Sequence, residues 1–234
     1  MKKLFDKSPL TFAILCIVIY VLVFGNADSL SEAMGCPKAL TLGVGVILSA
    51  VLYGFIRQNG LKAYCGLVPF NGDLKGFGWF IPLILLSTVN LWAGARMPAA
   101  PLTALLTAGS MLCVGFLEEV IFRGFLFNAM KKDGLKTAVI VSSLTFGAGH
   151  IVNLLMGAPL LDTLLQLVYA SAAGLMFTVI FLKGGSLIPC ILSHGVLNAL
   201  TVFLPDLTLS QNLMISGLHT VLCLIYTAWM WKKA

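Results

Sequence analysis

The sequence predicts an all-α membrane protein, a polytopic bundle of about eight transmembrane helices. Three observations predict this class. The chain is 59% hydrophobic and only 10% charged, whereas a soluble domain of similar length is about a quarter charged. Its apolar runs are mostly near the ~20 residues that a membrane-spanning helix needs. Its basic residues are concentrated in the short connections between those runs.

Eight apolar runs follow one another along the chain. The connections between them are short and rich in glycine, proline and charged residues, and no soluble domain or repeat interrupts them. We therefore expect residues 1–234 to form a single membrane-embedded domain, with a motif-bearing core at about 103–204. The runs lie at about 9–25, 39–57, 76–95, 103–130, 137–153, 160–182, 185–204 and 211–231.

The distribution of lysine and arginine predicts the orientation, because cytoplasmic connections carry an excess of these residues. Threading eight spans from a cytoplasmic N-terminus places only Lys38 and Arg96 outside, with Arg123 inside a span. We expect an inner (cytoplasmic) membrane location with both termini cytoplasmic. Residues 1–25 also resemble a cleavable signal peptide, although the length of the run favours its retention. The cytoplasmic basic residues would be Lys2, Lys3, Lys7, Arg57, Lys62, Lys75, Lys131, Lys132, Lys136, Lys183, Lys232 and Lys233.

Two adjacent glutamates and an arginine lie inside the fourth apolar run. Each ionisable group within a bilayer costs about 2.5–3.5 kcal/mol on insertion scales, so such groups are paired, functional or both. Glu119 and Arg123 are four residues apart, share one helix face and can form an ion pair. Glu118 is about 100° around the helix from Glu119 and is expected to face elsewhere.

Two other runs bring polar side chains to a comparable depth. Glu118 lies 13 residues before Lys131, and His150 lies 13 residues after Thr137, so both are ~20 Å from the ends of two antiparallel neighbours. In the seventh run, His194 and Asn198 share a helix face. We therefore expect a site between helices 4, 5 and 7.

These residue types in this arrangement can hydrolyse an amide. A carboxylate and an imidazole at one depth can activate water, and a second histidine with an asparagine can stabilise the oxyanion. Structural readings stay open, because polar side chains such as His150 and Asn198 also join membrane helices. A proton-coupled transporter uses buried Glu and His as well. The third histidine, His219, has no evident polar companions and is interpreted as structural or interfacial.

The spacing of these residues resembles the three motifs of the CAAX-protease and bacteriocin-processing family. This family includes the type II prenyl-protein endopeptidases and the bacterial Abi proteins. The flanking residues 122–124 and 146–150 are also similar, and the motifs together cover about residues 115–200. The three motifs read Glu118-Glu119-x-x-x-Arg123, Phe146-x-x-x-His150 and His194-x-x-x-Asn198.

The resemblance implies an intramembrane endopeptidase of about eight helices that cuts membrane-associated peptides or protein tails. It implies that Glu118 and His150 activate water, and that His194 and Asn198 form the oxyanion hole. Glu119, Arg123 and Phe146 would support these groups. The implied partners are the lipid bilayer and a membrane-associated peptide or protein substrate, reaching the site laterally or from the cytoplasmic side. No nucleic-acid partner is expected, and the oligomeric state is unknown.

Alternatives stay open both for the cofactor and for the activity. We expect a glutamate-type mechanism without a metal, since no H-E-x-x-H is present and Asn198 suits an oxyanion hole. The alternative is a Zn²⁺ ion bound by Glu118, His150 and His194. The alternatives to proteolysis are a non-catalytic peptide-binding protein of bacteriocin immunity and a proton-coupled transporter.

Overall fold

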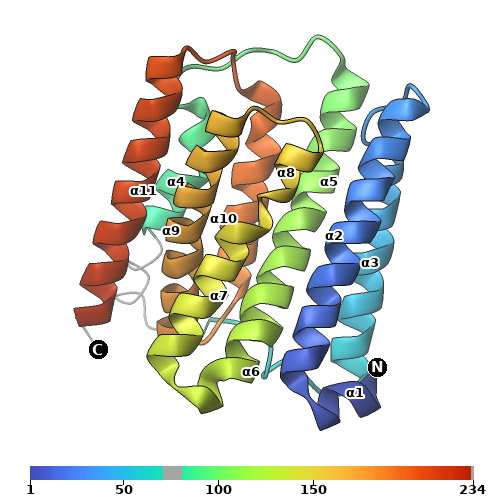
Figure 1. The fold of residues 1–234 in the computed structure, drawn as a ribbon, viewed down its shortest axis with the longest axis vertical. Coiled ribbons are helices and arrows are strands. Elements are labelled where there is room, and N and C mark those ends of the chain that lie inside the picture. Colours follow the sequence, from blue (N-terminus) through green and yellow to red (C-terminus); the bar gives the residue numbers. More distant parts are fainter. Residues whose placement is uncertain (71–80, 233–234) are drawn as a thin grey trace.

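The computed structural model describes residues 1–70 and 81–232, and within them the secondary structure is entirely helical (Figure 1). Six helices in this part are long and apolar enough to cross a membrane. The predicted all-α polytopic membrane bundle is therefore confirmed. The candidate spans are Pro9–Ala33, Ala39–Gln58, Pro101–Asp133, Leu135–Leu155, Leu160–Gly184 and Leu209–Lys232.

The elements follow the predicted runs in order. Several spans are interrupted by short 3-10 or π-helical turns, labelled η. The bounds are α1 Lys2–Lys7, α2 Pro9–Ala33, α3 Ala39–Gln58, α4 Ile81–Ser87, η2 Val89–Leu91, α5 Pro101–Glu119, η3 Val120–Phe127, α6 Asn128–Met130, η4 Lys131–Asp133, α7 Leu135–Gly149, α8 Val152–Leu155, α9 Leu160–Gly184, α10 Ile188–Ala199, η5 Leu200–Phe203 and α11 Leu209–Lys232.

Two of the eight predicted spans differ from a simple crossing helix. The seventh run forms a shorter apolar helix, Ile188–Phe203. The third run is described only from residue 81, where α4 and η2 are short; its first residues, 76–80, lie outside the described residues. Lys75 and Lys233 of the predicted cytoplasmic set also lie outside them. The count of eight spans therefore stays a prediction.

Local chemistry explains where several helices begin and end. The side chain of Ser8 accepts a hydrogen bond from the Thr11 N–H, and Pro9 occupies the first turn, so the chain restarts as α2 after α1. Pro101 likewise opens α5. Gly185 adopts φ +67° after α9, the left-handed conformation that commonly ends a helix.

The N-terminus and the end of α11 lie at the same end of the bundle (Figure 1). We call this the terminal end, and the opposite end, with the α2–α3 connection and α8, the distal end. Aromatic side chains pack the core near the terminal end, where Phe5 and Phe12 both contact Phe55 and Phe125. The bundle is therefore most densely filled on the side where the chain begins.

Candidate active site

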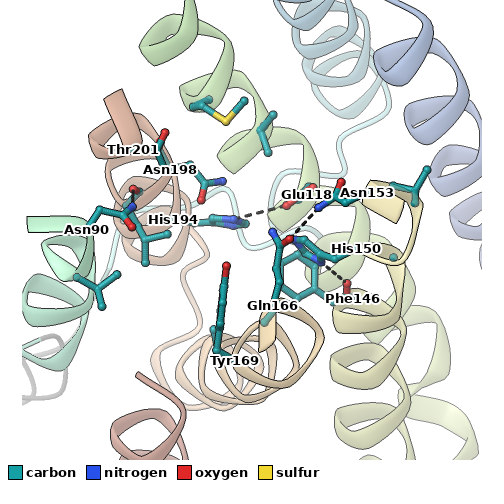
Figure 2. Close-up of a pocket in the computed structure, with 18 of the residues that line it drawn as sticks. Asn90, Glu118, Phe146, His150, Asn153, Gln166, Tyr169, His194, Asn198 and Thr201 are labelled. Carbon is teal, nitrogen blue, oxygen red and sulfur yellow. Dashed lines mark hydrogen bonds and ion pairs between the residues drawn. The ribbon is translucent and has the colours of Figure 1, made fainter. Parts of the chain in front are cut away.

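A cavity of about 490 Å³ lies in the distal half of the bundle, enclosed by α2, α5, α7, α9, α10 and α11. Figure 2 shows its polar side chains converging from several helices. Most of the wall is apolar, which suits a peptide-sized ligand with a few orienting polar groups. The cavity is lined by all four predicted catalytic residues, Glu118, His150, His194 and Asn198, and by Phe146.

The close crossing of α5 and α10 brings the first and third motifs together. A Cβ atom on Gly115 would lie only 2.5 Å from the Gly195 backbone nitrogen and 2.6 Å from its Cα. Glycine at both positions lets the two backbones nearly touch, as small residues do between membrane helices. The next residues along, Glu118 and Glu119 on α5 and His194 on α10, therefore face each other across the contact.

The imidazole of His194 lies between the two glutamates. Its Nδ1 is 2.9 Å from Glu119 Oε1, and its Nε2 is 3.5 Å from Glu118 Oε2. The two carboxylates have different surroundings, as their spacing on the helix predicts, but they share this histidine. Glu118 lines the cavity, whereas Glu119 is fully buried. Sequence spacing within one helix could not reveal this link, since His194 comes from another helix.

The predicted ion pair between Glu119 and Arg123 is confirmed. Arg123 Nη1 donates to Glu119 Oε1 over 3.0 Å, and both side chains are completely buried. The guanidinium lies 4.2 Å from the ring centroid of Phe146, a cation–π contact, and Nε approaches Thr178 Oγ1 at 3.4 Å. Arg123 thus compensates the buried carboxylate and links α5 to α7 and α9.

A π-helical segment follows immediately after the glutamate pair. Residues 120–127 form η3, and all eight are buried. π-Helical turns are rare and occur frequently at functional sites, because they locally redirect the side chains of a helix. Here the change from α to π geometry falls between Glu119 and Arg123. Nothing in the apolar sequence of this segment predicts it.

His150 closes one side of the cavity without touching Glu118. The predicted run extends to residue 153, but α7 ends at Gly149 and His150 is its C-cap. The ring Nδ1 lies 3.2 Å from the carbonyl oxygen of Phe146, and the two rings meet edge to face. His150 and Glu118 both line the cavity, so the structure brings them to one space.

Asn198 lies one helical turn from His194 on α10 and points into the same cavity (Figure 2). Its backbone carbonyl accepts a hydrogen bond from Thr201. Within the described part of the chain, no side-chain group holds the Asn198 amide, so its N–H groups are available to a ligand. Its neighbour Asn90, from η2, is instead engaged with the carbonyl oxygen of Leu197 at 2.6 Å.

Tyr20 is a site residue that the sequence does not reveal. Its hydroxyl donates to Glu118 Oε1 over 2.8 Å, and it reaches the site from α2, 98 positions earlier in the chain. The only sequence signal is a tyrosine in the middle of an apolar run, which is also typical of ordinary packing. The contact shows that the first span contributes to the site as well as to the bundle.

His219 also belongs to the cavity wall, which its sequence context does not indicate; its interpretation as structural or interfacial stays a prediction. Its ring stacks on Tyr169 at 5.1 Å and 20°, and Ser216 and Asn212 line the cavity beside it. The Nε2 atom is buried and, among the described residues, has no hydrogen-bond partner. Tyr169 points toward the catalytic side of the cavity (Figure 2).

The described residues contain no group of three His, Cys, Asp or Glu side chains close enough to hold a metal ion. The alternative zinc ligands Glu118, His150 and His194 line one cavity but do not gather around a point. His194 Nδ1 faces Glu119, whereas its Nε2 faces Glu118, which is itself one of the alternative ligands, at 3.5 Å. The metal-free mechanism therefore stays a prediction.

The fold and the cavity define a class, a polytopic membrane protein with a buried acid–histidine site inside its bundle. Residues 100–200 match the family model described as type II CAAX prenyl endopeptidase Rce1-like. The matched segment contains all three motifs, so this part of the chain is similar to that family. No curated protein and no solved structure gives a significant match to the chain.

Proposed function

We propose that the protein is a glutamate-type intramembrane endopeptidase that hydrolyses a peptide bond in a membrane-associated peptide or protein tail. The observation that supports this most strongly is the position of His194. Glu119 holds its Nδ1, so that Nε2 faces Glu118 at the cavity wall, with Asn198 one turn away. A carboxylate, an oriented imidazole and an amide thus face one cavity.

Glu118 and His150 activate the attacking water in this proposal. Both side chains line the cavity, and Glu118 Oε1 accepts a hydrogen bond from the Tyr20 hydroxyl. The other oxygen, Oε2, is buried, has no hydrogen-bond partner among the described residues, and lies 3.5 Å from His194 Nε2. In this proposal Oε2 takes a proton from water that enters with the substrate, while His150 orients that water.

His194 and Asn198 stabilise the oxyanion. A carboxylate only accepts hydrogen bonds, so the proton on Nδ1 is donated to Glu119, and Nε2 donates only when the ring is an imidazolium. In that state, the charges of Glu118, Glu119, Arg123 and His194 sum to zero, which suits a group buried in a bilayer. Nε2–H then donates to the carbonyl oxygen as negative charge develops there, together with the Asn198 amide.

The proposed reaction conserves its atoms and protons. Glu118 takes a proton from water, the water oxygen bonds to the carbonyl carbon, and the carbonyl π electrons move to the oxygen. The tetrahedral intermediate then collapses, the C–N bond breaks, and Glu118 returns its proton to the leaving nitrogen. The products are a carboxylic acid and an amine, between which the remaining water proton passes to leave a carboxylate and an ammonium group, and the protein is regenerated. No metal ion takes part in this scheme.

The test is hydrolysis by the purified protein in detergent, with a pooled set of membrane-anchored peptides. Glu118→Gln keeps the shape of the side chain but removes the base, so we expect the rate to fall about 10²–10⁴-fold. Glu32→Gln is the matched control, because Glu32 is exposed at the far end of α2. We expect wild-type cleavage to persist with a chelator.

Two results would contradict the proposal. Cleavage by Glu118→Gln at the wild-type rate would show that Glu118 is not the base. Cleavage abolished by the chelator and restored by Zn²⁺ would show that the metal-free scheme is wrong. Tight peptide binding by both proteins without any hydrolysis would favour the immunity alternative.

A further inference from the structure

The cavity extends toward only one end of the bundle within the described part of the chain. Several of its lining residues lie in distal connections: Lys38 precedes α3, Met156 follows α8, and Leu204 and Leu207 lie between η5 and α11. None of the described lining residues comes from a connection at the terminal end. The deepest wall is formed by aromatic side chains, including Phe122 and Phe177.

Tightly packed side chains fill the bundle between the cavity and the terminal end. Val120, Phe125 and Phe127 on η3 are completely buried, and so is Met176 on α9. The ring of Phe125 also contacts the aromatic cluster that α1, α2 and α3 form near the terminal end. A polypeptide cannot pass through a layer packed this densely without displacing it.

Charge distinguishes the two ends of the bundle. Among the described residues, two basic side chains lie at the distal end, and each is paired with an acid: Lys38 lies 2.7 Å from Asp28, and Arg96 lies 2.6 Å from Asp206. The terminal end carries ten of the described basic residues. They are Lys2, Lys3, Lys7, Arg57, Lys62, Lys131, Lys132, Lys136, Lys183 and Lys232.

An excess of Lys and Arg in short connections marks the cytoplasmic side of a membrane protein. The terminal end is therefore the cytoplasmic one, and the end toward which the cavity extends faces the outside. Of the two expected routes for substrate, lateral entry and entry from the cytoplasmic side, the second conflicts with this geometry. The cavity extends away from the side on which a cytoplasmic tail would be presented.

We propose that the site takes its substrate from the outer face of the membrane, as an exported or outer-leaflet-anchored polypeptide segment. The polypeptide nature of the substrate rests on the proposed function. The side of the membrane from which the substrate enters rests on the position of the cavity. The distal wall suits such a ligand, because it is polar: Asn153 donates to Gln166, and Asn212 donates to Asp162, both over 2.8 Å. These amides can exchange partners with a peptide backbone as it enters.

Thiol labelling tests the direction independently of catalysis. Cys36 is exposed in the distal α2–α3 connection, so it reports on that face without any substitution. Two reporter variants, each with one added cysteine, are made in a Cys36→Ser background that keeps the other five native cysteines. Lys132→Cys lies at the terminal end, and Ala173→Cys lies in the buried wall of the cavity. A small, membrane-impermeant thiosulfonate is applied to intact cells and to permeabilised cells, with Cys36→Ser alone as the blank.

We expect Cys36 and Ala173→Cys to react in intact cells, and Lys132→Cys to react only after permeabilisation. The reverse pattern for Cys36 and Lys132→Cys would overturn the orientation. An Ala173→Cys that reacts only after permeabilisation would overturn the direction of access, even if Cys36 lies outside.

A second arm tests the substrate class. A peptide that the purified protein cleaves in detergent is supplied outside intact cells. We expect hydrolysis there, and hydrolysis confined to permeabilised cells would overturn the inference. Absence of any cleavage in detergent would count against the proposed function alone, because the labelling does not depend on hydrolysis.

Discussion

At the scale of single residues, the site depends on how one imidazole is held. Glu119 and Glu118 approach opposite nitrogens of His194, while Arg123 compensates the inner carboxylate. The two glutamates are adjacent in sequence but have different surroundings, since Glu119 is sealed in the core and Glu118 borders the cavity. In the proposed function, this division gives the two acids separate roles: Glu119 orients the histidine, and Glu118 handles a proton.

Tyr20 gives a prediction at this scale. Tyr20→Phe removes the hydroxyl that donates to Glu118 over 2.8 Å but keeps the ring. A hydrogen bond to a charged group contributes about 1.5 kcal/mol or more, so we expect kcat to fall about tenfold or more with folding preserved. Tyr53→Phe on α3 is the control, because that ring is partly exposed and distant from the cavity. Equal activity of Tyr20→Phe and wild type would show that the contact does not serve catalysis.

The buried ion pair gives a second prediction. Glu119→Gln leaves the Arg123 charge without its carboxylate in a site with no exposure, a change that typically costs about 3–5 kcal/mol. We expect a lower yield of folded protein and a lower melting temperature in detergent, together with lost cleavage. Asp206→Asn breaks an ion pair whose acid is almost fully exposed, and it should leave the yield of folded protein, the melting temperature and cleavage unchanged. Equal melting temperatures for the two variants would contradict the structural role assigned to Glu119.

How far the sequence could predict this site differs from residue to residue. The motif spacing identifies Glu118, His150, His194 and Asn198 as candidates, and the structure places all four in one cavity. The sequence could not identify Tyr20, because a single tyrosine in an apolar run carries no periodic or chemical signal. Nor could it show the contact between Glu119 and His194, which depends on how two helices cross.

At the scale of helices, the closest contact is the crossing of α5 and α10. The absence of a side chain on Gly115 allows the backbone of Gly195 to approach to within contact distance. The short length of α10 also matters, because His194 and Asn198 lie within the bundle rather than near either end of it. The apolar runs predict these helices, but only the glycine pair fixes how closely they pack.

The crossing predicts the effect of one methyl group. Gly115→Ala would place its Cβ against backbone atoms of α10, which have no freedom to rotate away, so the helices must separate. We expect at least a tenfold loss of cleavage and a lower melting temperature. Gly43→Ala on α3 is the matched control, because its Cβ would meet nothing within 4 Å. A fully active Gly115→Ala protein would show that the site tolerates a wider crossing.

At the scale of the whole molecule, the bundle is divided into a packed terminal half and a hollow distal half. The aromatic cluster and the buried η3 segment fill the first, and the cavity occupies the second. Composition and run lengths predicted the membrane bundle because those signals are additive along the chain. The cavity could not be predicted in this way, since it arises from side chains on six helices that fail to meet.

The most direct test of the central claim is a single-turnover cleavage in ¹⁸O-labelled water, with enzyme in excess over peptide. If Glu118 acts as a base on water, the new carboxylate formed in the first turnover by the wild type contains ¹⁸O, and Glu118→Gln forms little product. An unlabelled carboxylate in the first turnover would mean that a protein carboxylate attacks the peptide itself. That result, or equal cleavage by Glu118→Gln, would contradict the account.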